Sequence, residues 1–151
     1  MSRRVMIASA AAAVVLALST AGCGDRRERS PEGIRWGSSV EEALAASRTT
    51  GRPVLIDFMA EWCPPCHAME DSTFSDPGVI SRAASFVPVR IDVDRRRDVA
   101  EAYGGNARKY GGIGIPNILF LDADGKKIRH IVGYYGPRQL TAVMDSVLAG
   151  T

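Results

Sequence analysis

One apolar segment that runs into a pair of cysteines constrains this chain more than any other feature. Residues 53–59 are apolar on both faces of an extended chain except at Asp57, and they lead into Cys63-Pro-Pro-Cys66. A strand that is apolar on both faces is typical of the centre of a sheet covered on both sides. The segment therefore predicts a central strand that enters the cysteine pair.

The rest of the folded part alternates between helical and extended patterns. Helices are predicted from a cap at Ser38 or Ser39 to Gly51, from the cysteine pair, from Asp76-Pro77, over residues 95–110 with a break at Gly104-Gly105, and from Pro137 to about Leu148. Further strands are predicted over residues 86–93, 117–121 and 128–132, the last two joined by a turn at 122–125. Together they predict an α/β domain over residues 36–151, with a mixed sheet of about four to five strands and helices on both faces.

The first residues have the pattern of an export signal. A basic start and an uncharged run over residues 5–18 precede small residues and then Cys23. That order is typical of a secretory signal peptide, and the run is short for a membrane span. Small residues before a cysteine resemble the lipobox of bacterial lipoproteins, which implies removal of residues 1–22 and lipid on Cys23. Ordinary cleavage after Ala21 is the alternative.

Residues 23–35 are polar and lack periodicity, which predicts a flexible tether between a lipid anchor and the domain. Once Arg3 and Arg4 leave with the signal, 17 basic and 17 acidic side chains remain. This balance leaves no basic face, so nucleic acid is not an expected partner. The expected form is a monomer held by lipid at the bacterial cell envelope, facing the periplasm.

The pattern Cys63-Pro-Pro-Cys66-His67 is shared by several kinds of site. It matches the attachment motif of c-type haem, and it could supply part of a zinc site, with His130 as the other histidine, or a structural disulfide. Small c-type cytochromes are helical, whereas a predicted strand enters this motif, which is the context of a redox dithiol. A structural disulfide here would close too small a loop to restrict the unfolded chain much. The pattern therefore favours a dithiol that needs neither metal nor other cofactor.

The predicted position of the pair, at a helix start, suits thiol exchange. Free backbone N–H groups and the helix dipole stabilise a thiolate there, so Cys63 is expected to be the exposed nucleophile. Cys66 lies one turn further and is expected to be shielded until a mixed disulfide forms. Pro64 and Pro65 lack N–H groups, which costs nothing in a first helical turn, and they stiffen the loop.

Two acidic residues are candidates for proton transfer at the pair. Asp57 stands in the apolar strand, and a buried carboxylate with a raised pKa could take the proton from Cys66. A structural Asp bound by backbone donors is the alternative. Glu70 is four residues after Cys66, on the same helix face. It is either a second acid near the sulfurs or a solvated surface residue.

The stretch from residue 54 to Cys66, with its acidic residue, its Ala-Glu-Trp and its cysteine pair, resembles the active-site segment of thioredoxins. Residues 110–120 resemble the loop that carries a cis-proline in that family. The resemblance implies a thioredoxin-like fold, a cis bond between Ile115 and Pro116, and pairing of the backbone there with a substrate chain. The substrate-binding residues expected here are Trp62, Pro64, Pro65, Ile115 and Pro116.

Cys66-His-Ala-Met-Glu70 and the following residues 72–77 resemble the C-terminal periplasmic domain of DsbD-type reductant transporters. The resemblance implies cysteines tuned by the acidic pair Asp57 and Glu70, and electron delivery to exported partners. The Pro-Pro dipeptide, Met59 in place of a bulky Trp, and extra residues near position 105 depart from these patterns. A multi-span domain is absent from the sequence, so a separate membrane protein is the expected electron donor.

The expected function is a thiol–disulfide oxidoreductase that reduces disulfides in exported proteins, with apocytochrome c cysteines as one target class. The enzymatic alternative is an oxidant or isomerase that uses the same pair. The non-catalytic alternatives are a thioredoxin-like binding module and a metallochaperone that binds Cu(I) through Cys63 and Cys66.

Overall fold

The computed structural model describes residues 33–105 and 114–150. Its elements in chain order are α1 (Val40–Thr50), β1 (Val54–Met59), α2 (Pro64–Ser72), α3 (Pro77–Ala83), β2 (Val87–Asp92), α4 (Arg97–Tyr103), β3 (Asn117–Leu121), β4 (Lys127–Val132) and α5 (Pro137–Ala149). Within those two ranges, no helix combines the length and the apolar character that a membrane crossing needs. The export signal, Cys23 and nearly all of the tether lie outside the described ranges.

The four strands form one mixed sheet in the order β2-β1-β3-β4. β1 runs parallel to β2 and antiparallel to β3, and β3 and β4 form the predicted antiparallel hairpin. The predicted central strand is confirmed, because β1 lies between two neighbours and is buried from Val54 to Phe58. An apolar strand with no solvent-facing side can bury both of its faces only in this position.

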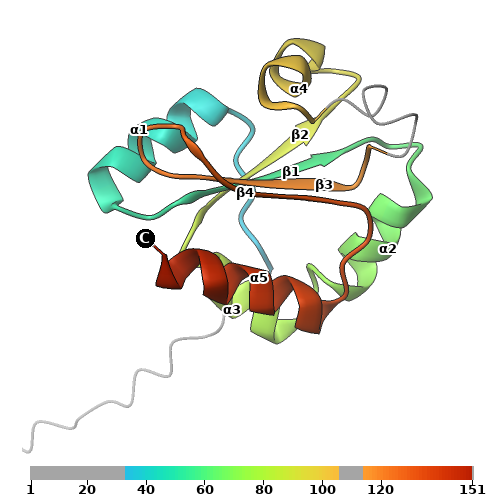
Figure 1. The fold of residues 1–151 in the computed structure, drawn as a ribbon. Coiled ribbons are helices and arrows are strands. Elements are labelled where there is room, and N and C mark those ends of the chain that lie inside the picture. The colour runs from blue at the N-terminus through green and yellow to red at the C-terminus, as the bar shows by residue number, and fades with distance from the viewer. Residues whose placement is uncertain (1–32, 106–113, 151) are drawn as a thin grey trace, which may run out of the picture.

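Helices cover both faces of the sheet (Figure 1). α1 and α4 lie on one face, and α2, α3 and α5 lie on the other. Two apolar clusters fill the spaces between these layers, one around Phe58 and Leu119 and the other around Leu55, Phe120 and Met144. The predicted α/β class, with a mixed sheet flanked on both faces, is therefore confirmed.

Local signals in the sequence place the helix ends. Ser39 caps α1 by accepting the Glu42 N–H at 3.2 Å, and Gly51 closes that helix at a φ of 72°. Asp76 caps α3 by accepting two backbone N–H groups of its first turn. These side chains satisfy donors that a helix start leaves without partners, which is why both starts could be read from the sequence.

The break predicted at Gly104-Gly105 in the helix over residues 95–110 is confirmed. α4 ends at Gly104, whose φ of 75° is left-handed and stops the helix. A Cβ atom on Gly105 would lie 2.3 Å from the ring of Phe58, so that position accepts glycine alone without a shift of the core. Residues 106–113, which include the start of the loop that resembles the cis-proline loop, lie outside the described ranges.

Candidate active site

Cys63 and Cys66 form a disulfide at the start of α2, with their Cα atoms 5.3 Å apart. Cys63 is the N-cap residue, and its Sγ accepts the Cys66 N–H at 3.3 Å. Pro64 and Pro65 take the first helical positions, where a missing N–H leaves no intrahelical bond unmade. The predicted helix start at the cysteine pair is confirmed.

The burial of the two cysteines differs from the prediction. Cys63 is 2% exposed and Cys66 is 5% exposed. The expectation of an exposed Cys63 is therefore wrong for the disulfide form, because both cysteines pack in one apolar cluster with Ala60 and Ile115. The sequence pattern could not show this, because the cluster also includes residues from distant segments, such as Ile115. Solvent reaches the flanking proline side chains instead.

The peptide bond between Ile115 and Pro116 is cis, as the resemblance implies. Both residues are buried, and Ile115 belongs to the same cluster as the cysteines. The carbonyl of Pro116 accepts the Gly133 N–H at 2.8 Å, which joins this loop to the segment after β4. The predicted cis bond is confirmed, and a role of Ile115 and Pro116 in substrate binding stays a prediction.

Three exposed large apolar side chains lie on segments that adjoin the cysteine pair or the cis-proline. Trp62, which is 60% exposed, directly precedes Cys63, and its indole Nε1 donates to Asp94 Oδ2 at 2.5 Å. Val132 is the register partner of the residue after Pro116. Tyr134 places its hydroxyl 3.0 Å from that of Ser72, the last residue of α2. Sequence reasoning missed Val132 and Tyr134, because their place beside the site depends on the pairing of β3 with β4.

Asp57 is buried in β1 and forms an ion pair that the sequence analysis did not anticipate. Its Cα is the register partner of Arg90 on β2, and Arg90 Nε donates to Asp57 Oδ2 at 2.8 Å. The other oxygen, Oδ1, has no hydrogen-bond partner among the described residues. Burial raises the pKa of Asp57 to about 6, although the Arg90 guanidinium acts to lower it. The predicted burial is confirmed, and a role as a base stays a prediction.

Glu70 contacts the same guanidinium, through Arg90 Nη2 and Glu70 Oε2. The Glu70 side chain is 50% exposed, so it stands at the surface end of a bridge whose other end is buried Asp57. Arg90 also lies over the ring of Trp36, with its Cζ 4.4 Å from the centroid. A signal that Arg90 has a special role was available, because it is the one charged side chain among the apolar residues 86–91. A signal for its pairing with Asp57 was not available.

The two histidines make separate contacts. His67 Nε2 lies 2.7 Å from the Glu61 carbonyl oxygen, and His130 Nε2 lies 2.7 Å from Asn117 Oδ1. In the part of the chain that the structure describes, no group of three or more His, Cys, Asp or Glu side chains is placed to hold a metal ion. The zinc alternative therefore has no cluster there to support it.

Comparison with known proteins agrees with this geometry. A family model described as a thioredoxin-like domain matches residues 40–148. The thiol:disulfide interchange protein DsbD of Ralstonia nicotianae is 36% identical over 100 residues, which make up 64% of this chain and 16% of that protein. The chain therefore spans less than a fifth of the length of this relative.

Solved structures show the same fold. A thioredoxin from Thermus thermophilus superimposes with a TM-score of 0.61 at 26% identity, over 77% of this chain and 88% of that one. The oxidised C-terminal domain of Neisseria meningitidis DsbD gives a TM-score of 0.55 at 22% identity, over 74% of this chain and 98% of that one. With the family model covering residues 40–148, the chain belongs to the thioredoxin-like family and is similar to the C-terminal domain of DsbD proteins.

Proposed function

We propose that this protein is a thiol–disulfide oxidoreductase that reduces disulfides of exported proteins through Cys63 and Cys66. The observation that carries the proposal is the disulfide at the start of α2, with a buried carboxylate, Asp57, joined through Arg90 to the same helix. Membership of the thioredoxin-like family and the likeness to proteins named for thiol:disulfide interchange support it.

The proposed reaction is a pair of thiol–disulfide exchanges. The Cys63 thiolate attacks one sulfur of the substrate disulfide, so that a mixed disulfide forms and one substrate sulfur leaves as a thiolate. The Cys66 thiolate then attacks Cys63 Sγ, which forms the Cys63–Cys66 disulfide and releases the second substrate thiolate. The substrate gains two electrons and two protons, and the cysteine pair loses the same number. A dithiol of a membrane protein in trans restores the reduced pair.

Asp57 is the proposed proton acceptor for Cys66 in the second exchange. A carboxylate with a pKa of about 6 is largely ionised at neutral pH and still basic enough to take a thiol proton. The proton passes on to the departing substrate thiolate or to solvent. The helix start at Cys63 supplies N–H groups and the positive end of the dipole, which stabilise its thiolate.

Trp62, the two prolines and the cis-proline loop are the proposed contact surface for the substrate. Trp62, which is 60% exposed, offers its ring beside Cys63, and strand pairing with the substrate chain at Ile115 is the proposed role of the cis-proline loop. Lipid on Cys23 is the proposed anchor to the envelope, and mass spectrometry of the membrane fraction from wild type and Cys23→Ser tests it. An unlipidated mature wild-type chain would contradict the anchor while leaving the exchange chemistry untouched.

Insulin reduction tests the catalytic proposal. Reduced wild-type protein is expected to reduce insulin, and Cys63→Ser is expected to lose this activity. Cys66→Ser is expected to accumulate a mixed disulfide with the substrate, because nothing resolves it. A Cys63→Ser protein that retains full activity, or a mixed disulfide trapped on Cys66 instead, would refute the assigned roles.

The direction of exchange is tested by the reduction potential of the pair, measured by equilibration with glutathione or a stronger dithiol. A reductase is expected to lie near the thioredoxin value of about −270 mV, whereas an oxidant lies near about −120 mV. A value at the oxidising end would replace the proposed reductase by the oxidant or isomerase that uses the same two cysteines.

A further inference from the structure

Arg90 joins two carboxylates of very different exposure. Its Nε bonds buried Asp57 of β1, and its Nη2 bonds half-exposed Glu70 of α2. The two contacts use different nitrogens of one guanidinium, so both exist at once. Arg90 itself is 22% exposed on β2, so a single side chain spans from the sheet interior to the surface.

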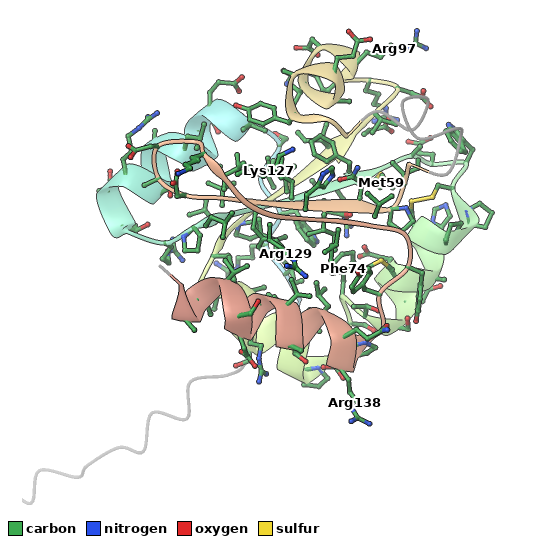
Figure 2. The ribbon with its side chains drawn as sticks, in the orientation of Figure 1. Met59, Phe74, Arg97, Lys127, Arg129 and Arg138 are labelled. Atoms are coloured by element: carbon green, nitrogen blue, oxygen red, sulfur yellow. A yellow bond between two sulfur atoms is a disulfide. The ribbon has the colours of Figure 1, made fainter. Side chains whose placement is uncertain are left out.

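Aromatic rings hold the guanidinium between the two acids. Its Cζ lies 4.4 Å from the ring centroid of Trp36 and 5.3 Å from that of Phe74, and these two rings pack edge to face. Figure 2 shows Phe74 on the side of the sheet that α2 and α5 cover. A cation over aromatic faces is attracted to them, which opposes its rotation into solvent.

We propose that Arg90 is a positioning residue that couples Glu70 to Asp57, so that the charge on Glu70 sets how firmly Asp57 holds its proton. The inference rests on the proposed thiol–disulfide exchange, in which Asp57 is the proton acceptor. The coupling would let the half-exposed Glu70 carboxylate, which solvent and a docked partner can reach, influence the proton transfer in that exchange.

Among the described residues, two charged side chains act on the proton affinity of Asp57. Arg90 from β2 lowers the pKa of Asp57, and Glu70 from α2 raises it. On the opposite side, the register partner in β3 is apolar Ile118. The cysteines carry no charge while they are disulfide-bonded. Because Asp57 is buried, a neighbouring charge acts on it through a medium of low polarity and has a large effect.

Glu70 acts on Asp57 in two ways, and both raise the proton affinity of Asp57. Its negative charge repels the Asp57 carboxylate directly, and it also shares the guanidinium that stabilises that carboxylate. When Glu70 is neutralised, both effects end, and Asp57 holds its proton less firmly. When Arg90 is removed, the Asp57 carboxylate loses its partner and holds its proton more firmly.

Carbon-13 NMR titration of the Asp57 carboxyl group, in the full-length disulfide form, tests the coupling. The pKa of Asp57 is expected to rise by about one pH unit or more in Arg90→Gln and to fall in Glu70→Gln. Arg90→Lys keeps the charge and is expected to lie between wild type and Arg90→Gln. The control is Arg82→Gln, which removes an arginine paired with Asp145 on α5 and is expected to leave Asp57 unchanged.

The double variant separates coupling through Arg90 from direct repulsion. In the Arg90→Gln background, Glu70→Gln is expected to shift the pKa of Asp57 by less than half of its effect in wild type. An equal shift in both backgrounds would show that Glu70 acts without Arg90 and would overturn the proposal. An Asp57 pKa that is unchanged in Arg90→Gln would do the same. If Arg90→Gln does not fold, Arg90→Met, which also lacks the charge, serves as the background.

This titration needs no substrate, so its outcome is independent of the proposed activity. If insulin is not reduced but the Asp57 pKa moves as expected, the reductase proposal fails and the coupling stands. In an active enzyme, the rate rises with pH as Asp57 loses its proton. The acidic limb of that profile is expected at higher pH in Arg90→Gln and at lower pH in Glu70→Gln, whereas a purely structural role would leave it in place.

Discussion

Two arginines of this chain bind carboxylates across elements that are far apart in sequence, and they differ in what surrounds them. Arg82 of α3 donates to both oxygens of Asp145 on α5, at 2.7 and 3.1 Å, with both side chains well exposed. Arg90 of β2 binds Asp57, whose side chain is 3% exposed. By geometry alone, the Arg82 pair is the better one, because it is bidentate.

The degree of burial decides how each arginine pair affects the pKa of its carboxylate. The Arg82 guanidinium holds the pKa of Asp145 below its usual range, as expected where water solvates both charges. At Asp57, burial outweighs the bond to Arg90, and the pKa rises to about 6. The buried pair therefore leaves a carboxylate that titrates near neutrality, which suits proton transfer, whereas the exposed pair leaves an ordinary ion pair between helices.

The largest expected effect is the pH dependence of stability that Asp57 causes. Its folded pKa of about 6 lies above its ordinary value of 3.8, so its stabilising contribution is complete below pH 4 and is lost as the pH rises through 6. The loss corresponds to about 3 kcal/mol of unfolding free energy. Urea unfolding of the disulfide form between pH 4 and 7 measures it.

Asp57→Asn is expected to lack this fall with rising pH. Asp145→Asn provides the contrast, because the lowered pKa of Asp145 gives the opposite sign: its contribution is present above its ordinary pKa and is lost as the pH falls. A wild type and an Asp57→Asn protein with the same pH dependence would show that burial does not raise the pKa of Asp57.

The next effect in size is the loss of either arginine at pH 7. Arg90→Gln is expected to lower the free energy of unfolding by about 2 kcal/mol, because it leaves a buried carboxylate without its partner. The loss of stability is limited because Asp57 can take up a proton when its partner is absent. Arg82→Gln is expected to have a clearly smaller effect in the same urea experiment, since water replaces the guanidinium at Asp145. Equal losses would remove the distinction between the two sites.

High salt is expected to distinguish the exposed Arg82 pair from the buried Arg90 pair. In 1 M NaCl the Debye length is about 3 Å, so interactions between exposed charges are screened. The difference between wild type and Arg82→Gln is expected to vanish there, whereas most of the difference for Arg90→Gln is expected to remain. Unfolding of the three proteins at low and high salt measures this. A loss of the Arg90 effect in salt would mean that solvent reaches the Asp57 bond.

The smallest expected effect on stability is that of Glu70→Gln. Glu70 is 50% exposed, so its bond to Arg90 exchanges readily with water, and the change is expected to stay below about 0.5 kcal/mol. The same substitution is expected to lower the pKa of Asp57, so its effect on proton affinity exceeds its effect on stability. A large loss of stability in urea would instead make Glu70 a structural residue.

Much of the fold could be predicted because its signals are local. Ser39 and Asp76 satisfy helix N–H groups within their own first turns, and Gly104 ends α4 by a conformation open to glycine. The pattern of residues 53–59 is local too, since burial of both faces needs no knowledge of which neighbours provide it.

Within the site, the features that were predicted correctly depend on residues close to one another in the sequence. The cysteine pair at a helix start and the burial of Asp57 follow from residues within a few positions of each other. The burial of Cys63 did not follow, because its apolar cluster includes residues from distant segments, such as Ile115. Val132 and Tyr134 were missed for the same reason.

The sequence by itself determined the α/β class, the position of the cysteine pair at a helix start and the presence of a buried acid before it, because these depend on local caps and on burial patterns along one strand. The thioredoxin-like fold was implied by the resemblance of the motifs around the cysteine pair and Pro116. Only the tertiary structure decided the partner of that acid. Parallel register between β1 and β2 brings Arg90 to Asp57 across 33 positions of sequence, and the packing of α2 on the sheet brings Glu70 to the same guanidinium. The register between strands and the packing of helices on the sheet depend on the whole chain. No local sequence pattern could therefore predict that these three side chains meet.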